Sequence, residues 1–112
     1  MNEKSQIAII GAGLMGHGIA QVFAVAGHLV TVFDPSTDAL ASLRDRVGRN
    51  LTDLGLSPAA AERIFPVESV ADAVKGADVV FEAGPESLAF KQQLFGELEV
   101  LCAAHTLLAS NT

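Results

Sequence analysis

The sequence predicts an α/β protein built on a doubly wound, parallel β-sheet with helices on both faces. Three observations support this fold class. Short apolar runs alternate with helical apolar spacing along the 112 residues, as in strands joined by crossover helices. The apolar run at residues 7–10 passes directly into a glycine-rich turn, and an acid, Asp34, closes the next apolar run. We therefore expect a three-layer α/β/α arrangement with right-handed connections.

The first strand and the first helix are predicted on either side of that turn. Residues 6–10 form a short apolar run that suits a strand covered on both faces. Over residues 14–26 apolar side chains recur at helical spacing, and Gly27 supplies a C-terminal cap. Residues 29–33 form the second strand. The helix face that we expect to be buried carries Met15, Ile19, Val22, Phe23 and Ala26.

The remaining elements follow the same alternation of strands and helices. A long helix is expected from a cap at Ser36 or Thr37 to Gly55. Its apolar stripe is Leu40, Leu43, Val47, Leu51 and Leu54. We expect further helices opening at 57–58 and over 69–75 and 87–102, and strands over 64–67, 78–82 and 106–109. The sequence stops just past the fifth strand, so we expect a Rossmann-type sheet truncated there, forming one domain over residues 1–112.

The glycine-rich turn has the spacing of a dinucleotide-binding fingerprint, and reads Gly11-Ala12-Gly13-Leu14-Met15-Gly16. In this motif the first glycine makes the tight turn, the second lets a pyrophosphate approach the backbone, and the third lets helix and strand pack closely. The helix N-terminus that follows is suited to an anion. The alternative interpretation is a glycine turn without a ligand. Strand, turn and helix in this order favour a cofactor.

Asp34 stands about twenty residues beyond the turn, where the adenosine ribose should lie. A carboxylate accepts hydrogen bonds from both ribose hydroxyls and repels a 2′-phosphate. The next residues, Pro35, Ser36 and Thr37, include no lysine or arginine. The sequence therefore predicts NAD rather than NADP, unless Asp34 only caps the following helix.

The carboxyl ends of the strands at 78–82 and 106–109 should face the same crevice. This places Ala83 near the cofactor, together with Asn111 after the last strand. Glu86 is either a cofactor contact or an acid at a helix N-terminus. Lys91, on the same expected helix, either reaches back to Glu86 or is solvated.

Composition excludes several other classes of protein. The net charge of −6 and the scattered basic residues argue against nucleic acid as a partner. No apolar run reaches the roughly 18 residues of a membrane span, and from the polar start of the chain we expect no signal peptide. Cys102 is alone, so a disulfide within the chain is excluded and a cytoplasmic location fits.

The histidines do not form a recognisable catalytic or metal site. His17 lies in the first turn of the first helix, where a structural or solvent-facing role is favoured over a catalytic one, while His28 and His105 look like turn residues. None of them shares metal-ligand spacing with another histidine or cysteine. The sequence therefore predicts a cofactor site without a metal and without an identifiable catalytic residue.

Three segments together resemble the start of 3-hydroxyacyl-CoA dehydrogenases. They are residues 7–34 (IAIIGAGLMGHGIAQVFAVAGHLVTVFD), 77–99 (ADVVFEAGPESLAFKQQLFGELE) and 107–112 (LLASNT), and they occur in the family's order. The resemblance implies oxidation of a 3-hydroxyacyl-CoA to the 3-ketoacyl-CoA with NAD, in fatty-acid metabolism. It also implies a homodimer and a separate helical substrate domain, with the family's catalytic histidine and glutamate, beyond the last residue given.

The resemblance also assigns roles to individual residues. The six residues of the glycine turn would hold the pyrophosphate and Asp34 the adenosine ribose. Glu86, Lys91 and Asn111 match positions at the nicotinamide half of the cofactor.

The stretch between the second and third strands departs from the family pattern. It is shorter than in classical members, and Asn50 stands where many members carry a CoA-contacting serine. Relatives with a shorter stretch act on small 3-hydroxy acids such as carnitine or gulonate, which gives a second hypothesis. A non-catalytic NAD-binding module is the third.

Overall fold

The structure is a computed structural model that describes residues 5–11, 14–83 and 107–110. Its described elements alternate between strands and helices along the chain, as predicted. They are β1 (Gln6–Ile10), α1 (Leu14–Val25), β2 (Leu29–Phe33), α2 (Thr37–Asp53), the 3₁₀ helix η1 (Pro58–Arg63), β3 (Ile64–Pro66), α3 (Val70–Val74), β4 (Val79–Glu82) and β5 (Leu107–Ser110).

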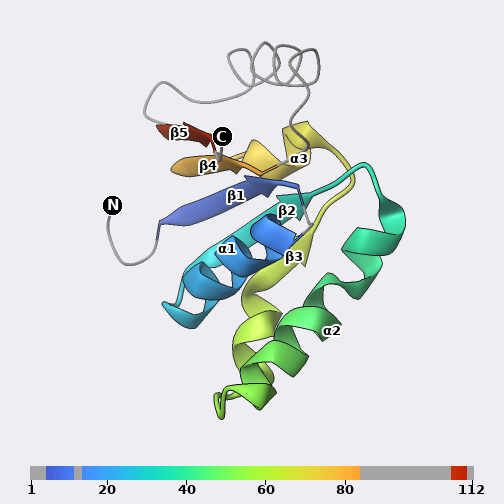
Figure 1. Ribbon diagram of the computed structural model, residues 1–112. Coiled ribbons are helices and arrows are strands. Elements are labelled where there is room, and N and C mark those ends of the chain that lie inside the picture. The colour runs from blue at the N-terminus through green and yellow to red at the C-terminus, as the bar shows by residue number, and fades with distance from the viewer. Residues whose placement is uncertain (1–4, 12–13, 84–106, 111–112) are drawn as a thin grey trace.

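The five strands form one parallel sheet in the order β3-β2-β1-β4-β5. This order is the part of the doubly wound arrangement that the sequence predicted. Figure 1 shows β1 in the middle, with β2 and β3 on one side and β4 and β5 on the other. The carboxyl ends of β1, β2 and β4 therefore meet at one edge of the sheet.

Helices cover both faces of the sheet, which confirms the three-layer prediction. On one face α1, α2 and η1 enclose a core that includes Ile9, Val32 and Leu51. On the other face α3 packs against the strands through a smaller core around Ile10 and Val80. Figure 1 shows α1 and α2 on the same side of the sheet.

Serine residues cap the N-termini of three of the described helices. Ser36, Ser57 and Ser69 each precede a helix, and each side chain accepts a hydrogen bond from a backbone N–H of the first turn. The helix expected at 57–58 is a 3₁₀ helix, and the last strand starts one residue later than expected. The helix expected over 87–102 lies outside the described residues.

Three apolar residues expected in the core are exposed: Val22, Leu54 and Ala26, the last of which lies just past the end of α1. Val22 on α1 is 65% exposed, whereas the buried positions of that helix include Ala20 and Ala24. Apolar residues predominate in α1, where only His17 and Gln21 carry polar side chains, so periodicity alone did not identify its inner face. Leu54 is 66% exposed because α2 ends at Asp53.

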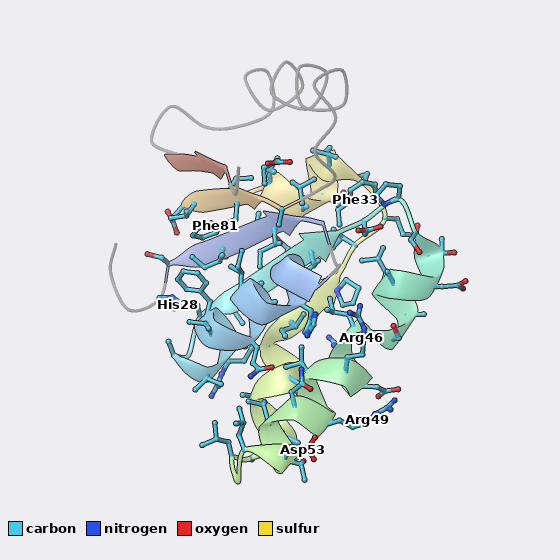
Figure 2. The ribbon with its side chains drawn as sticks, in the orientation of Figure 1. His28, Phe33, Arg46, Arg49, Asp53 and Phe81 are labelled. Atoms are coloured by element: carbon cyan, nitrogen blue, oxygen red, sulfur yellow. The ribbon has the colours of Figure 1, made fainter. Side chains whose placement is uncertain are left out.

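His28 directly follows the turn at residues 26–27, close to where a turn residue was expected, and its side chain is buried. It is only 7% exposed, and its ring lies edge-on to Phe23 with ring centres 5.7 Å apart. Its Nδ1 lies 3.0 Å from the carbonyl oxygen of Ser5. A carbonyl only accepts, so Nδ1–H is the donor. His28 thus ties the start of β2 to the segment before β1, and Figure 2 places it at that end of the sheet.

Candidate functional site

The first part of the site is the turn at the carboxyl end of β1. Gly11 has a φ of 122°, a backbone conformation that side chains with a Cβ rarely adopt. Its N–H donates to the carbonyl oxygen of Phe33 at 2.7 Å. This bond fixes the end of β1 against the end of β2. Of the other turn residues, Ala12 and Gly13 lie outside the described part, and Leu14 and Met15 are described by their backbone alone.

Gly16 shows how closely α1 approaches this turn. A Cβ at Gly16 would lie 1.8 Å from the carbonyl oxygen of Gly11, well inside any van der Waals contact. Only glycine at this position lets the first turn of α1 close onto the end of β1. The unpaired N–H groups of a helix N-terminus then stand at the carboxyl edge of the sheet, which suits an anionic group such as a pyrophosphate.

Asp34 directly follows β2, at the same edge of the sheet as the glycine turn. Its Oδ1 accepts a hydrogen bond from the backbone N–H of Ser36 at 2.7 Å, which orients the carboxylate. The N-cap of α2 is Ser36, whose side chain accepts from Ala39 N at 3.2 Å. The helix therefore has another cap, and the alternative role for Asp34 is not needed to explain how α2 begins.

The carboxyl end of β4 forms the other flank of the turn. The N–H of Ala83 donates to the carbonyl oxygen of Ile10 at 2.9 Å, so Ala83 lies beside the residue that precedes Gly11. Ser110, the last residue of β5, is in register with Glu82. The structure thus brings Gly11, Gly16, Asp34 and Ala83 to one edge of the sheet. Glu86, Lys91 and Asn111 lie outside the described residues.

Glu82 is a charged residue of this edge that the sequence analysis did not single out. It is the last residue of β4 and is 1% exposed. The signal in the sequence is an acid that ends an otherwise apolar strand, next to the glycine turn of β1. Taken alone, that signal does not distinguish a solvated acid from a buried one.

His17 connects α1 to α2. Its Nδ1 lies 3.5 Å from Nη1 of Arg46, and its Nε2 lies 3.3 Å from Nδ2 of Asn50. The guanidinium of Arg46 also donates to Ala39 O and Ser42 Oγ. Figure 2 shows Arg46 on the inner side of α2 and Arg49 pointing outward. These contacts are consistent with the structural role expected for His17.

The described residues show neither a metal site nor a membrane span. Among them no group of three or more histidine, cysteine, aspartate or glutamate side chains is placed to hold a metal ion. Within the same residues no helix has the length and apolar character needed to cross a bilayer.

Comparison with known proteins identifies the family. The family model described as "3-hydroxyacyl-CoA dehydrogenase, NAD binding domain" matches residues 6–112. The chain belongs to the 3-hydroxyacyl-CoA dehydrogenase family. Its described sheet is that of the NAD-binding domain of this family, and its cofactor is NAD.

Individual relatives agree with this assignment. The chain is 39% identical to 3-hydroxyadipyl-CoA dehydrogenase of Escherichia coli over all of its own length and 25% of the relative. It is 34% identical to L-carnitine dehydrogenase of Streptomyces griseus, over 98% of the chain and 34% of that protein. The crystal structure of 3-hydroxybutyryl-CoA dehydrogenase from Escherichia coli matches with a TM-score of 0.85 and 36% identity, covering 100% of this chain and 25% of that one. The chain thus spans between a quarter and about a third of these proteins.

Proposed function

We propose that this chain is the cofactor-binding part of an enzyme that oxidises a 3-hydroxyacyl-CoA to the 3-ketoacyl-CoA by hydride transfer to NAD. The observation that carries the proposal is the junction of β1 and α1. There, the carbonyl of Gly11 lies so close to Gly16 that position 16 has no room for a side chain. Asp34 lies just past the end of β2, the neighbouring strand. NAD supplies the hydride acceptor, and the residues of this chain bind and orient it.

Each residue of the proposed cofactor site has one role. The turn from Gly11 to Gly16 receives the pyrophosphate through the N–H groups that follow Gly11, since the N–H of Gly11 itself donates to Phe33 O. The carboxylate of Asp34 receives the ribose hydroxyls of adenosine. Ala83 leaves space at the end of β4 for the nicotinamide half. By resemblance, Glu86, Lys91 and Asn111 contact that half as well. The acid–base residues of the reaction belong to the catalytic part that the larger relatives carry.

A small 3-hydroxy acid is the second candidate substrate. The similarity to L-carnitine dehydrogenase favours it. So does Asn50, whose side-chain amide is in hydrogen-bonding contact with the ring of His17, with Nδ2 and Nε2 3.3 Å apart. An amide engaged with α1 is less available to a CoA moiety than a free serine hydroxyl would be. The acyl-CoA remains the first candidate because the matching family model and a relative such as 3-hydroxyadipyl-CoA dehydrogenase are both named for CoA-linked substrates.

Assay of the protein encoded by the whole reading frame separates these substrates. We expect NADH consumption with acetoacetyl-CoA and none with dehydrocarnitine. Activity with the carnitine ketone alone would replace the first candidate by the second. A protein that binds NADH and acts on neither compound would support the third hypothesis, a non-catalytic NAD-binding module.

Domain organisation, assembly and location are part of the same proposal. Residues 1–112 form one NAD-binding domain, and the whole protein is a cytoplasmic homodimer without nucleic acid or membrane partners. The single cysteine of the chain fits a reducing compartment. Sedimentation of the whole protein at increasing concentrations tests the dimer, since a monomer at every concentration would contradict it.

A further inference from the structure

Glu82 is a buried acid to which the proposed function gives no role. The side chain is 1% exposed, and its Oε1 is closed off from solvent. The other buried polar residues in the described part of the chain, Ser5 and His28, lie at the amino ends of β1 and β2. Glu82 is instead at the carboxyl edge, where the cofactor site is. Burying a carboxylate is costly, so its position calls for an explanation.

The register of the sheet places Glu82 between β1 and β5, on one side of the proposed cofactor site. Glu82 is paired with Ile10, the residue before the glycine turn, and with Ser110 on β5. In the proposed site the pyrophosphate lies at that turn and the adenosine extends toward Asp34 on the β2 side. The nicotinamide half must then extend the other way, over the ends of β4 and β5. Glu82 ends β4.

We propose that the carboxylate of Glu82 sets the preference of this site for oxidised over reduced cofactor. The nicotinamide ring of NAD⁺ carries a positive charge that NADH lacks, and the rest of the two molecules is the same. A negative charge enclosed by protein acts on that ring with little screening by solvent or salt. Glu82 therefore stabilises bound NAD⁺ and leaves bound NADH nearly unaffected. It determines specificity through its field, without contact with the reacting atoms. This inference rests on the proposed cofactor site.

The test compares the dissociation constants of NAD⁺ and NADH for the wild-type chain and for E82Q, which removes the charge and keeps the shape. NADH binding is followed by fluorescence, and NAD⁺ binding by displacement of NADH. We expect E82Q to raise the ratio Kd(NAD⁺)/Kd(NADH) on the order of tenfold. If E82Q does not fold, E82L takes its place, because apolar replacement of a buried charge is often tolerated. The same rise is expected.

Two further variants separate charge from shape and from position. E82D keeps the charge and should keep the wild-type ratio. E68Q removes an exposed carboxylate that follows β3, the edge strand at the other end of the sheet from β5. This variant should also leave the ratio unchanged. A ratio within twofold of wild type in both E82Q and E82L would overturn the role of Glu82, as would equal shifts in E82Q and E82D. If neither nucleotide binds the wild-type chain, the proposed cofactor site itself fails, and this inference fails with it.

Discussion

Gly16 and Gly18 are two positions apart on α1, yet a side chain would have opposite effects at the two sites. A Cβ at Gly16 would lie 1.8 Å from Gly11 O, whereas a Cβ at Gly18 would meet no atom within 4 Å. We expect G16A to force the helix away from the turn and to weaken NADH binding by more than about tenfold. G18A should keep the affinity and raise the unfolding free energy by up to about 1 kcal/mol, because alanine is the better helix former.

Fluorescence titration and urea unfolding of both variants check this pair. Wild-type NADH affinity in a folded G16A chain would contradict the geometry of the turn. A comparable loss of affinity in both variants would show that any change in α1 disturbs the site, and that the close approach at Gly16 is not the cause.

Part of the site could be predicted from sequence because its chemistry is local. The glycine turn and Asp34 are recognisable from spacing along a single strand-helix-strand unit. The burial of Glu82 depends instead on how β4 packs between β1 and β5, and the contacts of His17 depend on α2, about thirty residues further along the chain. Such properties are set by tertiary neighbours that spacing does not reveal.

At the scale of elements, residues of the apolar stripe expected on α2 differ in burial, because the stripe extends past the end of the helix. Leu51 is fully buried in the larger core, while Leu54, one turn later in sequence, is beyond the end of the helix and exposed. L51A should lower the unfolding free energy by about 2–5 kcal/mol. L54A should change it by no more than about 0.5 kcal/mol. Chemical denaturation of both variants measures the difference, and equal losses would mean that the end of α2 is packed in solution.

The end of α1 depends on a side chain from another element. Nη1 of Arg63, at the end of η1, donates to Ala24 O at 2.8 Å. This carbonyl in the last turn of α1 also accepts from the N–H of Gly27 at 3.1 Å, so Arg63 adds a second hydrogen bond to it. We expect R63M to cost about 1 kcal/mol of stability. R49M, which alters an exposed arginine of α2, is the matched control and should cost little. Thermal unfolding distinguishes the two, and the prediction is wrong if both variants melt like wild type.

Most element boundaries were predictable, and the exceptions have physical reasons. Serine caps and turn glycines mark helix ends locally, and parallel strands show as apolar runs, so β1 and β2 have the expected bounds. The inner face of α1 was mispredicted at Val22. Apolar residues predominate in this helix, and the small residues Ala20 and Ala24 are the ones buried against the sheet. Close packing of a helix on a sheet is decided by shape as well as by polarity.

At the scale of the whole molecule, the described fold brings the residues of the proposed cofactor site to one edge of one sheet. The strand order puts β1 between β2 and β4, so the turn after β1 is flanked by Asp34 on one side and by Glu82 on the other. A dinucleotide fits this order, with one half toward each flank. The remaining machinery of the proposed dehydrogenase corresponds to the larger part of its relatives, of which this chain spans 25% in the case of 3-hydroxyadipyl-CoA dehydrogenase.

Parallel fluorescence titrations of the 112-residue chain with NADH and with NADPH test the central claim most directly. The account predicts saturable binding of NADH, and binding of NADPH at least about tenfold weaker, because Asp34 repels a 2′-phosphate on the adenosine ribose. Equal affinity for the two nucleotides would contradict the role of Asp34. Absence of saturable binding for both would contradict the cofactor site at the junction of β1 and α1.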